Sequence, residues 1–175
     1  MGACSHRYRG NDMDRPQRKY PRLKHYDYSL PGYYYVTIHT QEQGNVLSTV
    51  GCGLPPTVRL TPIGKLAEQQ LRQLETRFPF VRIDKYCVMP THIHAIIRFL
   101  ERPAGASPRP TLTDVVCAYK SITTRLCNSV FHTPGRKLFQ ASFYEHVIRN
   151  EKAYQECWRY IDDNPLKWAL APEDR

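Results

Sequence analysis

The chain has 175 residues, which suits one domain with short appendages, and 41% of them are hydrophobic, enough to bury a core. Lysine and arginine outnumber aspartate and glutamate by 25 to 16, giving a formal charge of +9. That excess favours a polyanionic partner, either nucleic acid or an acidic membrane surface. No apolar run approaches the roughly 18 residues of a membrane span, and the N-terminus lacks the apolar core of a secretory signal. We therefore expect no membrane insertion and a cytoplasmic location.

The first half of the chain predicts a basic arm, a strand, a loop and a helix. Residues 1–25 are polar and rich in Arg and Lys, so we expect a flexible arm that contacts phosphates. The aromatic and β-branched segment 32–41 predicts a strand, and the Gly- and Pro-containing segment 42–60 a loop or ragged hairpin. A helix is predicted over 61–78, with Thr61 as its N-cap followed by a proline.

The second half predicts two paired strands, then a helix, a strand and a last helix. Pro90 separates strands 80–89 and 92–100, which we expect to form a hairpin, and 101–110 is a Pro/Ala/Gly linker. Asn150 is a fitting N-cap for the last helix, and Pro165 a stop. The remaining predicted elements are a helix at 111–130, a strand at 142–150 and a helix at 151–164.

This order predicts an α+β, ferredoxin-like (RRM-like) split βαβ fold. Its antiparallel four-stranded sheet would carry helices on one face, with an additional C-terminal helix. The domain would cover residues 26–170, followed by a tail at 171–175. In this plan the first and third strands are central, and the third is the strand that begins at His92.

Two histidines stand one residue apart in the segment "VMPTHIHAII" (88–97). Alternate residues of a strand share a face, so His92 and His94 would lie side by side. Two neutral imidazoles at that spacing can hold one divalent ion. The ordinary alternative is a pair of hydrogen-bonded surface histidines, which an isolated His-x-His motif favours.

The six cysteines form no C-x-x-C pair, so a zinc ribbon is not expected, and free thiols agree with a cytoplasmic protein.

Four segments of the chain form a recognisable combination: "YDYSLPGYYYVTIHT" (26–40), "YCVMPTHIHAII" (86–97), "FYEHVIRNE" (143–151) and "RYIDDNPLKW" (159–168). Together they resemble the HUH single-tyrosine transposases, and most closely the REP-associated tyrosine transposases. The resemblance covers roughly residues 24–170 and implies a metal-dependent single-stranded DNA endonuclease and strand transferase. Such enzymes form a 5′-phosphotyrosine intermediate, in DNA transposition or on palindromic genomic repeats. The implied partner is single-stranded or hairpin DNA, and relatives occur both as monomers and as homodimers.

The resemblance also implies site residues. Tyr160 matches the nucleophile, and Asn164 matches a metal-site Gln or Asn beside His92 and His94. The implied cofactor is a divalent metal ion. Mg²⁺ or Mn²⁺ is favoured, and imidazole ligands would also suit zinc. Helix geometry places Tyr160 about 110° from the centre of the apolar stripe of its helix, on a flank that can reach a cleft. The ordinary alternatives are half-buried packing for Tyr160 and a helix C-cap for Asn164.

Alternative assignments of the nucleophile, of the site residues and of the function remain open at this point. Among the twelve tyrosines, Tyr119 is the second candidate nucleophile, although it lies in an apolar stripe that favours the core. Two positions are open for Tyr144, Glu145 and His146. They could line the site, or they could lie at a sheet edge without a functional role. A non-catalytic, RRM-like nucleic-acid-binding protein has the same fold plan. A small metalloenzyme with another substrate is disfavoured by the charge and by the lack of an acidic base near the histidines.

Overall fold

The computed structural model describes residues 22–51, 53, 55–101 and 110–170. A four-stranded antiparallel sheet in the order β4-β5-β1-β6 forms its centre. The predicted arm and tail lie outside the described residues, except for residues 22–25. The strands are β1 (Gly32–His39), β4 (Val81–Val88), β5 (His92–Phe99) and β6 (Tyr144–Ile148), with a separate small hairpin of β2 (Ser48–Val50) and β3 (Val58–Leu60).

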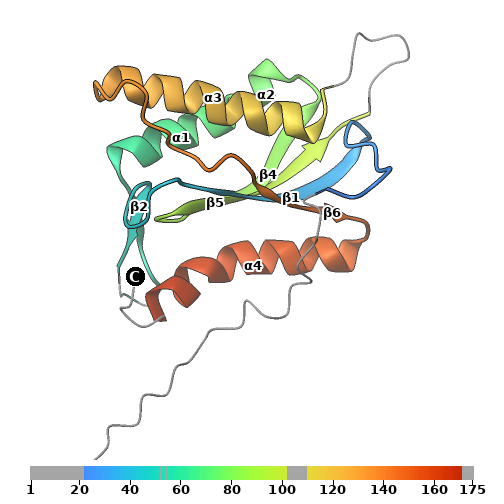
Figure 1. The fold of residues 1–175 in the computed structure, drawn as a ribbon. Coiled ribbons are helices and arrows are strands. Elements are labelled where there is room, and N and C mark those ends of the chain that lie inside the picture. Colours follow the sequence, from blue (N-terminus) through green and yellow to red (C-terminus); the bar gives the residue numbers. More distant parts are fainter. Residues whose placement is uncertain (1–21, 52, 54, 102–109, 171–175) are drawn as a thin grey trace, which may run out of the picture.

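The helices form two layers, one on each face of the sheet (Figure 1). On one face, α1 and α3 pack side by side, and on the other face α4 runs alone across the strands. This arrangement confirms the predicted α+β plan, with β1 and the histidine strand β5 in the centre. The helices are α1 (Pro62–Arg72), the short α2 (Leu74–Arg77), α3 (Leu112–Val130) and α4 (Glu151–Leu170).

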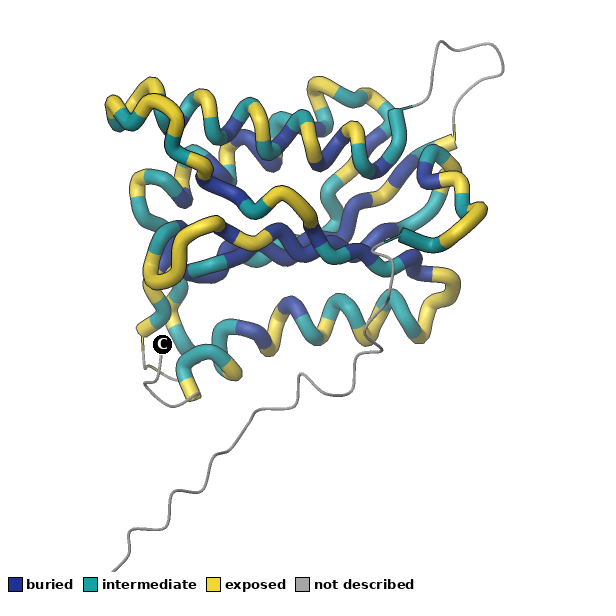
Figure 2. Tube along the Cα trace, in the orientation of Figure 1, coloured by how far each residue is buried: buried dark blue, intermediate teal, exposed yellow. Residues whose placement is uncertain are grey.

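Strand alternation divides the buried side chains between these two layers. Tyr34, Val36 and Ile38 of β1 belong to the larger core beneath α1 and α3, together with Ile93 and Ala95 of β5. The intervening positions face α4 and form a smaller cluster around Tyr35, Ile96, Ile148 and Ile161. In Figure 2 the buried residues are concentrated in the sheet, between the two helical layers.

The predicted helix starts are confirmed, but the predicted end of the last helix is wrong. Thr61 accepts a hydrogen bond from the Gly64 amide, and Asn150 accepts one from the Ala153 amide. Instead of ending at Pro165, α4 continues for five residues beyond it. Proline removes one helical N–H and disfavours the helical conformation of the residue before it. Here tertiary packing outweighs that preference, because the last turn places Trp168 against His92.

A β-bulge in β4 changes which face its side chains occupy. Ile83 pairs with Ile97, whereas Lys85 pairs with Ile96, so the register shifts between them. Without the bulge, Ile83 and Lys85 would share a face. With it, Ile83 packs on the larger core and Lys85 reaches α4.

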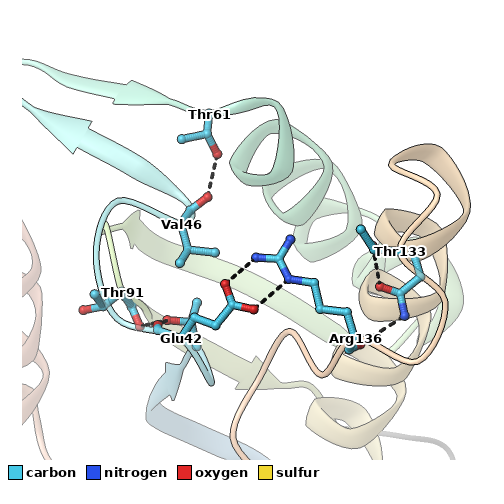
Figure 3. Close-up of polar contacts among 8 residues, drawn as sticks. Glu42, Val46, Thr61, Thr91, Thr133 and Arg136 are labelled. Carbon is cyan, nitrogen blue, oxygen red and sulfur yellow. Dashed lines mark hydrogen bonds and ion pairs between the residues drawn. The ribbon is translucent and has the colours of Figure 1, made fainter.

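A polar cluster joins the loop after β1 to the loop after α3 (Figure 3). Arg136 donates from Nε and Nη2 to the two carboxylate oxygens of Glu42, at 2.9 and 2.7 Å. The pKa of Glu42 is lowered by that hydrogen bond. Backbone and side-chain atoms of Thr40 also hydrogen-bond the Thr91 carbonyl, at 2.8 and 2.9 Å. The end of β1 is thereby fixed beside the turn that precedes His92.

Gly64 allows α1 to approach the chain closely at Leu47. It is buried, and a Cβ built on it would overlap the Leu47 carbonyl. The same stretch is joined to α1 by the Thr61 hydroxyl, which donates to the Val46 carbonyl at 2.8 Å (Figure 3).

We predict that Gly64→Ala lowers the free energy of unfolding by about 1–3 kcal/mol, because the methyl group displaces packed backbone. Urea unfolding followed by circular dichroism measures the change. Gln69→Ala, at an exposed position of the same helix, should change stability by no more than about 0.5 kcal/mol. Equal stabilities of the two variants would contradict the close approach.

Candidate active site

The sheet face beneath α4 carries the two histidines. The register aligns Cys87, His94, Thr37 and Tyr144 in one row across the four strands. At the end of the β1–β5 pair, His92 lies opposite His39. As predicted, the two histidines share a face, and that face is opposite to the one carrying Ile93 and Ala95.

His94 is held by hydrogen bonds from β1. Its side chain is 3% exposed, and its Nδ1 lies 2.7 Å from the Tyr35 hydroxyl and 3.0 Å from the Thr37 hydroxyl. Both hydroxyls can accept as well as donate. When Nδ1 carries the proton it donates to one of them, and Nε2 is then in the lone-pair form that metal ligation requires.

His92 lies at the open end of the same face. Its ring centroid is 4.5 Å from that of His94, 5.3 Å from that of His39 and 5.8 Å from that of Trp168. The Thr91 hydroxyl lies 3.2 Å from its Nδ1. The two imidazoles are therefore adjacent and largely buried, in positions fixed by neighbouring side chains.

Helix α4 brings Tyr160 and Asn164 over these histidines. The Tyr160 ring centroid lies 5.3 Å from that of His94 and 6.1 Å from that of Tyr35. Asn164 follows one turn later and Trp168, over His92, one turn after that. Asn164 is 8% exposed and lies on the helix between the residues that touch His94 and His92. All four residues singled out from the sequence thus gather in one place.

His92, His94, Tyr160 and Asn164 are called the centre from here on. Polar contacts on either side of this centre hold helix α4 against β4. Lys85 forms an ion pair with Asp162 at 2.5 Å, and its ammonium lies 4.7 Å from the Trp158 ring centroid. Near the start of α4, the Tyr154 hydroxyl donates to the Asp84 carboxylate at 3.2 Å. These contacts fix the rotation of α4 that directs Tyr160 towards His94.

The remaining residues considered from the sequence lie on different faces of the sheet. Tyr119 is fully buried on the opposite side of the sheet and donates to the Ala67 carbonyl at 3.2 Å. Burial raises the pKa of its phenol, so it is a core residue. Glu145 is also buried on that side and accepts from the Tyr28 hydroxyl at 2.7 Å. Tyr144 and His146 lie on the α4 face by their pairing with Thr37 and Tyr35.

Four residues around the centre were not identified from the sequence: Tyr35, Thr37, His39 and Trp168. The first three alternate along β1, so their common face could be inferred from sequence. Their alignment with His92 and His94 depends on the β1–β5 register, which sequence did not provide.

In the part of the chain that the structure describes, no group of three or more His, Cys, Asp or Glu side chains is arranged to hold a metal ion. The candidate set here consists of two imidazoles and one amide. Within the same described ranges, no helix is both long enough and apolar enough to cross a membrane.

Comparison with known proteins identifies one sequence relative and a structural likeness. The chain is 29% identical over 169 residues to an "uncharacterized protein" of Haemophilus influenzae, covering 86% of this chain and 89% of the relative. Its structure is similar to that of a REP-associated tyrosine transposase bound to a REP hairpin, with a TM-score of 0.61 and 20% identity. That match covers 86% of this chain and 75% of the transposase. The likeness confirms the predicted fold.

A protein of Deinococcus radiodurans provisionally named a transposase is a weaker match, with a TM-score of 0.48 and 20% identity. It covers 81% of this chain and 95% of that protein. No family model matches the sequence.

The Cys87 thiol beside His94 offers a test of how α4 covers this face. Burial, assisted by Asp162, raises the pKa of Cys87 from 9.0 to about 11. Its thiolate population near pH 8 is therefore about 100-fold smaller than in the unfolded chain. We predict that iodoacetamide alkylates Cys87 about 100-fold more slowly in the native protein than in urea, as measured by peptide mass spectrometry.

The exposed Cys117 serves as the internal control and should react at similar rates in both states. The raised pKa also means that the native state keeps this proton longer than the unfolded state. Stability should therefore fall as the pH rises from about 9 to about 11. Equal rates for Cys87 in the two states would contradict the packing of α4 over it.

Proposed function

We propose that this protein cuts and rejoins single-stranded or hairpin DNA through a covalent 5′-phosphotyrosine link to Tyr160. The observation that supports this function is the placement of Tyr160 against His94, with Asn164 one turn further along α4. The fold likeness to a transposase bound to a REP hairpin agrees with it. Its biological setting would be DNA transposition or the processing of palindromic genomic repeats.

The residues of the centre suit a divalent cation. His92, His94 and Asn164 offer two imidazole nitrogens and an amide oxygen, and three protein ligands leave further positions for phosphate oxygens. The hydroxyl contacts at His94 Nδ1 are the kind of outer-shell support that metal-bound histidines have. Mg²⁺ or Mn²⁺ bound there would neutralise charge on the phosphate and orient the bond to be cut.

The proposed reaction is an exchange of phosphodiester bonds. The Tyr160 oxygen attacks phosphorus and loses its proton, the new O–P bond forms, and the bond to the 3′-oxygen breaks. The leaving 3′-oxygen takes up a proton and becomes a hydroxyl. Rejoining reverses these steps with a second 3′-end, so no nucleotide cofactor is required. Lys167, whose ammonium lies 5.0 Å from the Tyr160 ring centroid, adds positive charge near the attacking group.

The alternative function, RRM-like binding without catalysis, finds less support. An RRM stacks bases on aromatic residues of an open sheet face. Here the corresponding face is covered by α4, and Tyr35 is only 4% exposed (Figure 1). A binder of that type would need α4 displaced before its sheet could be used.

Tyr160→Phe should abolish covalent DNA attachment, because it removes the oxygen through which the bond forms. The free energy of unfolding should fall by about 1 kcal/mol or less, since the ring and its packing remain. The assay incubates labelled single-stranded hairpin DNA with the protein and Mg²⁺ or Mn²⁺, then detects adducts on denaturing gels.

Tyr144→Phe and Tyr119→Phe are the matched controls and should both retain adduct formation. Peptide mapping of the adduct identifies the modified residue directly. A phosphotyrosine at any position other than Tyr160 would rule out the assignment.

Metal binding provides a second test, with a readout that does not require cleavage. In Mn²⁺ titrations by calorimetry, His92→Ala and His94→Ala should each eliminate binding. Tyr35→Phe, which removes the hydroxyl at His94 Nδ1, should weaken it by about 10- to 100-fold.

The neighbouring tyrosine of β1 is a close control. Tyr34 points to the other side of the sheet, where its hydroxyl donates to the Leu30 carbonyl at 2.8 Å. Tyr34→Phe therefore also loses one hydrogen bond, at a cost of about 1 kcal/mol, but should bind Mn²⁺ like the unmodified protein. If both phenylalanine variants bind Mn²⁺ equally well, Tyr35 has no part in the metal site.

A further inference from the structure

We propose that a cavity at the start of α4 binds an unpaired nucleobase of the DNA strand that occupies the candidate active site. This inference rests on the proposed function and adds a substrate-binding position to it. The cavity has a volume of about 410 Å³ and is bounded by all four strands of the sheet and the first residues of α4. Its lining residues are Tyr33, Asp84, Arg98, Ile148, Arg149, Asn150, Glu151 and Tyr154.

The lining groups suit a base better than a bare phosphate. Two arginines are balanced by the carboxylates of Asp84 and Glu151, so the formal charge of the lining is zero. A phosphate would meet those carboxylates at close range. A nucleobase presents donors and acceptors together with two flat faces, and so matches a mixture of guanidinium, carboxylate, amide and aromatic groups.

Arg98 provides a surface on which a base can stack. Its guanidinium carbon lies 5.2 Å from the Tyr33 ring centroid, and Tyr33 in turn packs edge-on against Tyr154 at 5.1 Å. Arg98 is exposed, so a base can lie against the guanidinium plane on the side away from Tyr33. The base would then lie on a guanidinium that Tyr33 supports by a cation–π contact, and stacking of bases on arginine is common in single-strand recognition.

The acidic residues of the cavity are already oriented by neighbours. Asp84 accepts from the Tyr154 hydroxyl, and Glu151 accepts from the Gln155 amide at 2.6 Å. Both carboxylates keep acceptor capacity for an N–H group of a base, such as the ring N–H of thymine. The cavity is thus organised before any strand arrives.

The cavity and the candidate active site share one face of the sheet. Arg98 and His94 are four residues apart on β5, a separation of about 13 Å along a strand. Tyr154 and Tyr160 are six residues apart on α4, about 9 Å along the helix axis. A strand whose phosphate reaches Tyr160 can therefore place a base only a few nucleotides away in this cavity.

The test measures equilibrium binding of the full chain, by fluorescence anisotropy with EDTA present, to a thymidine oligonucleotide and to an abasic strand of equal length. We expect the unmodified protein to prefer the strand with bases. Arg98→Ala should reduce that preference by about tenfold. Arg98→Lys should bind the abasic strand normally but show the same reduced preference, because lysine keeps the charge and loses the planar surface.

Arg125→Ala is the matched control, since it removes one exposed arginine from α3 on the other side of the sheet. It should leave the preference for bases unchanged. If Arg98→Ala and Arg125→Ala weaken both strands by equal factors, Arg98 contributes only charge and the proposal is overturned. Thermal unfolding of each variant checks that the fold is retained. Because no cleavage is measured, failure of this binding site is distinguishable from failure of Tyr160 to form an adduct.

Discussion

The antiparallel pairing of β1 with β5 is the constraint on which the centre depends. It places Thr37 opposite His94 and His39 opposite His92, and it brings the Tyr35 hydroxyl to the His94 ring. A shift of β5 by one residue against β1 would turn His92 and His94 to the other face of the sheet, away from Tyr35, Thr37 and His39. The apolar alternation that buries Ile93 and Ala95 under α1 and α3 therefore also fixes the orientation of the histidines. The same strand alternation therefore determines both the packing of the core and the geometry of the centre.

Helix α4 completes the centre from the opposite side. The sheet supplies imidazoles and hydroxyls, and the helix supplies a phenol, an amide and an indole at one-turn intervals. Its rotation is set by apolar packing of Ile161 and by the Lys85–Asp162 ion pair. The half-exposed ion pair contributes little to stability, so the apolar contacts hold most of the interface. The reach of α4 past Pro165 matters as well, because a helix ending there would leave His92 without its Trp168 contact.

Much of this arrangement could be predicted from local sequence. Aromatic and β-branched residues identified β1, and Pro90 separated β4 from β5. The caps Thr61 and Asn150 marked helix starts, and the His-x-His spacing implied a shared face. Features that depend on contacts between distant parts of the chain could not be predicted from local sequence. The neighbours of His94 depend on strand register, and the continuation of α4 depends on packing that overrides the local preference of proline. The bulge in β4 has no clear local signal, because the aspartate at position 84 is common in regular turns as well as in distorted strands.

The same bulge has a consequence for how copies of the protein can associate. Strand β4 forms an outer edge of the sheet, where unpaired backbone groups could recruit a strand from another molecule. The irregular spacing between Ile83 and Lys85 interrupts the row of N–H and C=O groups that such a strand would need. Lys85, drawn towards α4, adds a charge on this edge. Extension of the sheet at β4 into larger aggregates is therefore disfavoured, and the chain can carry a long, largely apolar central sheet at little risk of uncontrolled strand exchange there.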